Sequence, residues 1–187
     1  MVLVGHIPVC KLECFSKKKR AVEGYRLFHE YMRTLLKPSA QSISTPLVPA
    51  LMRGSIRTIF PILSAYIADY PEQCLVACCK ENACPTCLVK PTERGAPIHS
   101  VLREQTTTLE ILGQQSRGEK PDEYVDQSLR PVNPFWADLP HCDIFSCMTP
   151  DLLHQLYKGV FKDHLVNWAT EAMGGGSDEM DRRFRVV

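Results

Sequence analysis

Asp69 is a candidate residue for metal-dependent chemistry. It follows an apolar run and precedes Pro71 in the string AYIADYPEQ, and proline suits the first turn of a helix. Phosphoryl-transfer enzymes hold divalent cations with two or three carboxylates that come from separate elements. One carboxylate is not a site, and Asp69 could instead cap the helix that Pro71 opens. We therefore treat Asp69 as a candidate catalytic residue, with helix capping as the alternative.

Cys84 and Cys87 form a CPTC motif. Two thiolates at this spacing can hold one edge of a tetrahedral zinc ion, which needs four ligands in total. Further ligands of the right type lie nearby, at Cys78, Cys79 and His99. The alternative is that the pair packs as small apolar residues in a tight turn. A thioredoxin-like redox role is less favoured, because the motif does not open a long amphipathic helix.

Asp151 and His154 are spaced so that they share one face of an expected helix. Together they could bind a metal ion or position a phosphate. The alternative is that Asp151 neutralises the positive end of the helix while His154 lies at the edge of the apolar stripe.

The basic run Lys17, Lys18, Lys19 and Arg20 could contact phosphates, although solvated charge is the more common role of such a run. The whole chain carries 22 basic and 21 acidic residues, a formal net charge of +1, so no global field favours nucleic acid. A second group of ligand-type residues fits no standard metal site, and we expect it to be structural: His141, Cys142, Asp143, Cys147 and His164.

Periodicity predicts the elements that must position the N-terminal candidates. Residues 2–9 are typical of a short strand. Residues 17–36 are expected to form an amphipathic helix, with Ser16 as its N-cap and Pro38 as its end. Residues 56–69 are rich in isoleucine and aromatic residues and predict a buried strand that ends at Asp69.

The C-terminal half is expected to consist of a polar segment followed by one long helix. Residues 90–135 are predicted to be rich in loops, with one helix near 100–114. A helix over 150–173 is predicted, with Thr149 as its cap, Pro150 at its first position and a glycine run as its end. Its apolar stripe is expected to be buried: Leu153, Tyr157, Val160, Phe161, Leu165 and Trp168.

Length and composition indicate one soluble domain, with 187 residues of which 44% are apolar and 23% charged. The opening MVLVGHIPVC is a poor signal peptide, and no stretch approaches the roughly 20 apolar residues of a membrane span. We therefore expect an intracellular, reducing environment, in which the nine cysteines lie in a core or bind metal rather than form disulfides. Both ends of the sequence are expected to continue into a longer polypeptide.

Three strings in this order resemble the central part of the Plavaka-type transposases of fungal mobile elements, which are related to the CACTA group. The strings are HIPVCKLECFSKKKR, AYIADYPEQCLVACCKENACPTCLV and NPFWADLPHCDIFSCMTPDLLHQLYKGVFKDHLVNW. The resemblance spans about residues 5–187. It implies an α/β fold with a partial RNase H-like core, in which a mixed sheet is flanked by helices.

The resemblance also implies roles for the candidate residues. Asp69 is similar to the second acid of a metal-binding triad. Cys84 and Cys87 resemble a CxxC pair within a loop-rich insertion, here residues 78–135. Asp151 and His154 resemble an Asp-x-x-His motif to which we assign no role.

The activity that the resemblance implies is cut-and-paste DNA transposition with Mg²⁺ or Mn²⁺. The DNA partner would be the transposon ends, the compartment the nucleus, and the full-length protein could be a homo-oligomer. The other acids of the triad are expected outside this sequence, so we expect the chain to be inactive alone. The alternative is a non-catalytic zinc knuckle, holding Zn²⁺ through Cys84 and Cys87, that binds DNA or protein.

Overall fold

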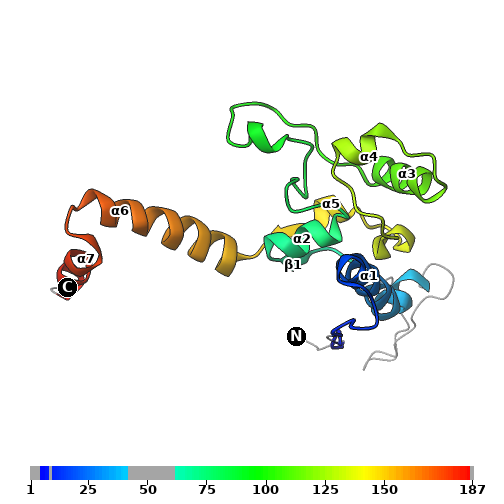
Figure 1. The fold of residues 1–187 in the computed structure, drawn as a ribbon, viewed down its shortest axis with the longest axis horizontal. Coiled ribbons are helices and arrows are strands. Elements are labelled where there is room, and N and C mark those ends of the chain that lie inside the picture. The colour runs from blue at the N-terminus through cyan, green and yellow to red at the C-terminus, as the bar shows by residue number, and fades with distance from the viewer. Residues whose placement is uncertain (1–4, 9, 42–61, 186–187) are drawn as a thin grey trace, which may run out of the picture. The chain divides into compact units, whose positions relative to one another are not determined.

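The structure is a computed structural model that describes residues 5–8, 10–41 and 62–185 (Figure 1). The chain divides into two compact units. Unit 1 comprises Met1–Tyr66 and Pro71–Met148, and unit 2 comprises Ile67–Tyr70 and Thr149–Val187.

Unit 1 is built from short helices and loops around one long helix. The long helix is α1 (Lys17–Gln41). The other elements are α2 (Tyr70–Val76), η1 (Pro91–Glu93), α3 (Gln105–Ser116), α4 (Asp122–Asp126), η2 (Phe135–Asp138) and α5 (Ile144–Cys147).

The core of unit 1 forms where α1, α2 and η2 meet. Trp136 is completely buried, and its indole N–H donates to the Val76 carbonyl oxygen at 2.7 Å. His29 is also completely buried on α1. One ring nitrogen of His29 lies 3.1 Å from the Leu75 carbonyl oxygen, and the other accepts from the Phe135 N–H at 3.3 Å. The buried His29 side chain therefore links α1 to α2 and η2, and both of its ring nitrogens have hydrogen-bond partners.

Helix α3 lies where a single helix is predicted in the polar segment. It buries Thr108, Ile111 and Leu112, one face at helical spacing. It ends at Ser116, and Gly118, two residues further on, has a φ of +86°, a conformation that favours glycine. The N–H groups of Gly118 and Glu119 bond to carbonyls of Gln115 and Gln114, which satisfies the last turn in a Schellman motif.

Unit 2 contains most of a two-stranded parallel sheet and a run of helices. The strands are β1 (Tyr66–Ala68) and β2 (Met148–Pro150). The helices are η3 (Leu152–Val166), which has wide π-type turns, α6 (Asn167–Ala172) and α7 (Gly176–Phe184).

The long N-terminal helix is confirmed, but its predicted end is wrong. Helix α1 runs through Pro38 to Gln41. Pro38 has no backbone N–H to donate, but the loss of this one hydrogen bond does not stop the helix, which continues for three more residues. The predicted strand 2–9 is not seen at residues 5–8, and its remaining residues lie outside the described ranges. Of the predicted strand 56–69, the described part contains only the short strand β1.

The predicted C-terminal helix is confirmed in position and corrected in its start and its burial. Asp151 is the N-cap, and Thr149 and Pro150 pair in β2 instead. The stripe that was expected to be buried is 53–68% exposed: Leu153, Tyr157, Val160, Phe161, Leu165 and Trp168. Periodicity identifies the apolar face of a helix but not the surface that covers it.

The described residues therefore form a largely helical structure with one small parallel sheet. The presence of both helices and paired strands agrees with the coarse α/β prediction, whereas the RNase H-like core with a mixed sheet stays a prediction.

Candidate functional site

Two candidate carboxylates follow two neighbouring strands at the same edge of the sheet. Asp69 comes directly after β1, and Asp151 comes directly after β2. The Asp151 N–H donates to the Ala68 carbonyl oxygen at 3.2 Å, which extends the ladder by one residue. In a parallel pair this bond places Asp69 and Asp151 opposite each other, on backbones about 4.8 Å apart. The structure thus brings together two residues from distant parts of the sequence.

Asp151 also organises the start of η3. Its carboxylate accepts from the Leu153 N–H at 2.9 Å and from the His154 N–H at 3.4 Å, and it contacts Nδ1 of the His154 ring. The His154 ring, followed by the Leu153 N–H, holds the pKa of the Asp151 carboxyl below its ordinary value. Asp151 therefore caps η3 as an ionised carboxylate at neutral pH, and a role as a metal ligand stays a prediction.

The two aspartates that follow the paired strands do not make a complete metal site. Within the described ranges, no group of three or more His, Cys, Asp or Glu side chains is arranged to hold a metal ion. Two carboxylates together with substrate phosphates are nevertheless a common environment of Mg²⁺, which keeps several waters when it binds.

The CPTC loop forms a tight turn around one sulfur atom. The Cys84 sulfur lies 3.3 Å from the Thr86 hydroxyl. Burial alone would raise the pKa of the Cys84 thiol, but hydrogen bonds from Thr86 and Cys87 bring it below its ordinary value. The ends of the loop are held by antiparallel bridges that pair Cys79 with Leu129 and Cys87 with Leu102.

Of the additional zinc ligands proposed from the sequence, the two cysteines face elsewhere. The Cys78 thiol is fully buried and lies 3.8 Å from the His29 ring. The Cys79 thiol is directed at the Cys84 carbonyl oxygen, 4.0 Å away. Burial raises the pKa of the Cys78 thiol, and a hydrogen bond with Cys74 followed by burial raises that of Cys79. His99 is exposed.

Two buried arginines flank the CPTC loop, and sequence reasoning did not single them out. Arg103 is 4% exposed and donates to the Cys84 carbonyl at 2.8 Å and to the Gln127 carbonyl at 3.0 Å. Arg130 is 8% exposed, donates to the Cys79 carbonyl at 2.7 Å and stacks on a tyrosine ring of α1. Each is an isolated arginine in the sequence, so no pattern marks it.

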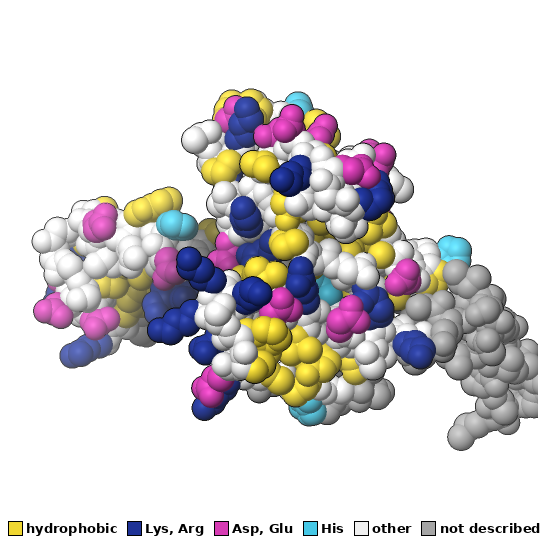
Figure 2. Space-filling view, turned by 45° about the vertical axis from the view of Figure 1, so that its right-hand side comes forward, with side chains coloured by type: hydrophobic (Ala, Val, Ile, Leu, Met, Phe, Trp, Pro, Cys, Tyr) yellow, Lys and Arg dark blue, Asp and Glu magenta, His cyan; other side chains and the backbone are white. Residues whose placement is uncertain are grey.

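The basic run occupies the first turn of α1. Lys17, Lys18 and Lys19 are exposed, as a phosphate contact requires. Arg20 is half-buried, and its side chain donates to the Phe15 carbonyl at 3.0 Å, where it holds the chain that precedes the helix. On the face drawn in Figure 2, basic and acidic side chains are interspersed, so any DNA contact would be local.

Three of the ligand-type residues that were expected to be structural have structural positions: Cys142, Asp143 and Cys147. Cys142 and Cys147 are buried, and the Cys147 thiol donates to the Leu63 carbonyl at 3.2 Å. Asp143 caps α5 by accepting from the Phe145 N–H.

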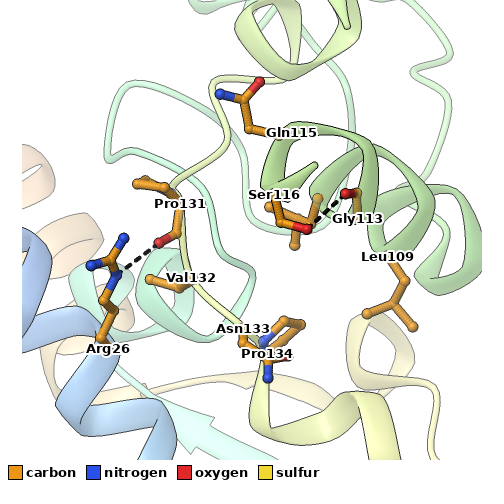
Figure 3. Close-up of a pocket in the computed structure, with 10 residues that line it drawn as sticks. Arg26, Leu109, Gly113, Gln115, Ser116, Pro131, Val132, Asn133 and Pro134 are labelled. Atoms are coloured by element: carbon orange, nitrogen blue, oxygen red, sulfur yellow. Dashed lines mark hydrogen bonds between the residues drawn. The ribbon is translucent and has the colours of Figure 1, made fainter. Parts of the chain in front are cut away.

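A pocket of about 690 Å³ in unit 1 lies between α1, α3 and residues 131–134 (Figure 3). Arg26 is its charged group, and it donates to the Pro131 carbonyl at 3.2 Å and pairs with Glu23. The rest of the lining is apolar or neutral: Leu109, Leu112, Gly113, Gln115, Ser116, Pro131, Val132, Asn133 and Pro134. The lining therefore contains no acid, histidine or thiol for catalysis, and none of the predicted site residues.

No helix within the described ranges combines the length and the apolar character that a membrane span requires.

Comparison with known proteins identifies the family of the chain. The model of the family described as Plavaka transposase matches residues 1–169, which is most of the sequence and includes the strand edge and the CPTC loop. No curated protein and no solved structure matches the chain. With the family matched from the first residue to α6, the chain belongs to the Plavaka transposases.

Proposed function

We propose that this chain supplies the carboxylate edge of a cut-and-paste transposase nuclease domain, with Asp69 and Asp151 as its metal-binding residues. The observation that carries the proposal is their position, one residue past each of two paired parallel strands. An RNase H-like core would hold its acids on neighbouring strands in this way, and the small sheet would then be part of a larger one.

The chemistry of this edge fits a hard divalent cation. Carboxylate oxygens are the preferred protein ligands of Mg²⁺ and Mn²⁺, and a cation bound here would supply an activated water and stabilise the leaving oxygen. The contribution of the chain would be to hold Asp69 and Asp151 on the neighbouring ends of two paired strands. His154 keeps the Asp151 carboxylate in place, because the two side chains are in contact.

DNA at the ends of the mobile element is the proposed partner, and the nucleus the proposed compartment. The exposed lysines 17–19 are the proposed phosphate contacts, since they are free of the structural bond that occupies Arg20. A homo-oligomer would bring together the two ends of one element, as transposition requires.

We expect the purified chain to bind duplex DNA weakly and to leave it uncut. The probes would be a duplex that carries candidate element ends from the flanking genomic sequence and a random duplex, each with Mg²⁺ or Mn²⁺. Two carboxylates do not complete a triad, so no nicking and no strand transfer should appear on sequencing gels. Charge reversal of the three lysines should weaken binding and flatten its salt dependence.

Two results would contradict this account. Nicking of the element end that is lost in Asp69→Ala would show that the chain is a complete nuclease. DNA binding that is the same in the triple lysine variant would remove these residues from the interface. Charge reversal at Lys158 and Lys162, exposed residues of η3, is the matched control.

A further inference from the structure

The helix η3 of unit 2 carries large apolar side chains that remain exposed. The structure describes the whole of η3, and no residue in it is buried. The turns of a π-type helix are wide, so residues four and five positions apart lie on the same side. Five apolar residues with this spacing are 48–62% exposed, and we call them the apolar face of η3: Leu152, Leu156, Val160, Phe161 and Leu165.

The charged residues near the middle of η3 lie away from the apolar face. Lys158 is two positions from both Leu156 and Val160. Asp163 is likewise two positions from both Phe161 and Leu165. Residues two positions apart on a helix do not share a face. The apolar face is therefore uncharged along its centre, and a surface that covers it well must itself be apolar.

The order of the residues along the apolar face is nearly the same in both directions. About a point between Val160 and Phe161, the counterpart of Leu156 is Leu165, and Val160 and Phe161 exchange places. An antiparallel pair of η3 helices related by a two-fold axis at this point would place apolar residues opposite apolar residues. A two-fold interface needs this self-complementarity, because each residue meets the counterpart of its own partner.

The area of the apolar face is sufficient for a weak dimer. Five half-exposed side chains of this size offer on the order of 500 Å² per copy, or roughly 1,000 Å² in total, which is close to the lower limit of a specific interface. Exposed apolar patches of a few hundred Å² commonly mark interaction sites. We expect a dissociation constant of about 10–100 µM, as for other interfaces at the low end of the size range.

We propose that the apolar face of η3 docks against the same face of a second copy of this chain, as an antiparallel helix pair. The inference gives the proposed homo-oligomer a surface, and it rests on that part of the proposed function. Its test contains neither metal nor DNA, so a failure would leave the proposed role of Asp69 and Asp151 standing.

The first test is sedimentation equilibrium of the purified chain over a range of concentrations. The mass should rise from that of the 21.2 kDa chain to twice this value as the concentration increases. Phe161→Glu buries a charge beside its two-fold mate and should raise the dissociation constant at least about tenfold. Val125→Glu is the matched control, because it makes the same kind of change at a residue of α4 that is 75% exposed, and it should not alter the dimer.

A chain that stays monomeric at the highest concentration would overturn the proposal, because the face would then be covered by a different surface. A dimer of unchanged affinity in Phe161→Glu would also overturn it. Phe161 is 54% exposed, so the fold of the variant should be preserved, and an unchanged circular dichroism spectrum verifies this.

A second measurement tests the antiparallel arrangement. In the Cys10→Ser/Cys14→Ser chain, which lacks two exposed thiols, Val160→Cys places a thiol close to the proposed two-fold axis. Peroxide should link this thiol to its mate in the second copy, oxidising two thiols to one disulfide while peroxide is reduced to water. Leu152→Cys lies far from its mate and should not link. Equal linkage at the two positions, measured by mass spectrometry of the joined peptides, would contradict the proposal.

Discussion

Replacing Trp136 by alanine is expected to unfold most of unit 1 at room temperature. The indole is completely buried, packs edge-on against Phe145 with ring centres 5.9 Å apart, and donates to the Val76 carbonyl. Removing a buried tryptophan costs about 3–5 kcal/mol, and the Val76 carbonyl also loses its indole donor. This loss is a large part of the whole stability of a typical domain, about 5–15 kcal/mol. Urea unfolding followed by circular dichroism measures the loss.

The second tryptophan of the sequence is the control for this prediction. Trp168 lies on α6 and is 63% exposed, so Trp168→Ala should change the free energy of unfolding by less than about 1 kcal/mol. Equal destabilisation by the two substitutions would contradict the assignment of the core to the surroundings of Trp136.

The stability of unit 1 is expected to fall as the pH decreases from about 6.5 to about 4, because of His29. Burial, followed by the positive charge of Arg33, lowers the pKa of His29 from 6.5 to about 4, against opposing contributions from the Leu75 carbonyl and Glu30. The unfolded chain therefore binds a proton in this range that the folded chain does not. The contribution of neutral His29 to the free energy of unfolding is complete above pH 6.5. It is lost as the pH falls from 6.5 to about 4, and the total loss is roughly 3 kcal/mol.

The variant His29→Gln isolates this effect from the titration of surface carboxylates. Glutamine keeps a donor and an acceptor but does not titrate. The variant should be less stable than wild type at pH 7, and the difference in unfolding free energy should shrink towards pH 4. Cys78, from the turn after α2, and Phe135 of η2 contact the His29 ring, and Arg33 and Glu30 of α1 are the charged groups that act on it. A difference that stays constant with pH would show that His29 does not control this dependence.

Sequence reasoning was most informative where one periodic pattern lies within one element. The two long helices were found because their apolar residues recur at helical spacing along a continuous segment. The predicted start of η3 was two residues too early. Thr149, Pro150 and Asp151 all suit a helix start, and only the pairing of Thr149 and Pro150 in β2 shows that Asp151 is the cap. The family resemblance was confirmed. Of the two interpretations of the CPTC motif, zinc binding stays a prediction.

What sequence could not predict depends on contacts between distant segments. Asp69 and Asp151 were separate candidates, and only the pairing of β1 with β2 makes them neighbours. His29 appears in the sequence as an ordinary residue of an amphipathic helix, and its burial depends on α2 and η2. The direction of each cysteine sulfur likewise follows from packing, which spacing does not encode.

The central claim is that Asp69 and Asp151 form a single metal-binding edge, and iron-mediated cleavage tests it most directly. Fe²⁺ replaces Mg²⁺ in oxygen-ligand sites, and with ascorbate and peroxide it cuts the backbone close to where it is bound. Mass spectrometry of the wild-type chain should find cuts near both residues. Asp69→Asn and Asp151→Asn should each abolish both cuts. Asparagine still caps a helix, so the second variant keeps the start of η3.

Asp163→Asn, which removes an exposed carboxylate from η3, should leave the cleavage pattern unchanged. Cuts near Asp69 that persist in Asp151→Asn, or cuts near one of the two residues alone in the wild-type chain, would contradict the claim that the two strand ends form one site.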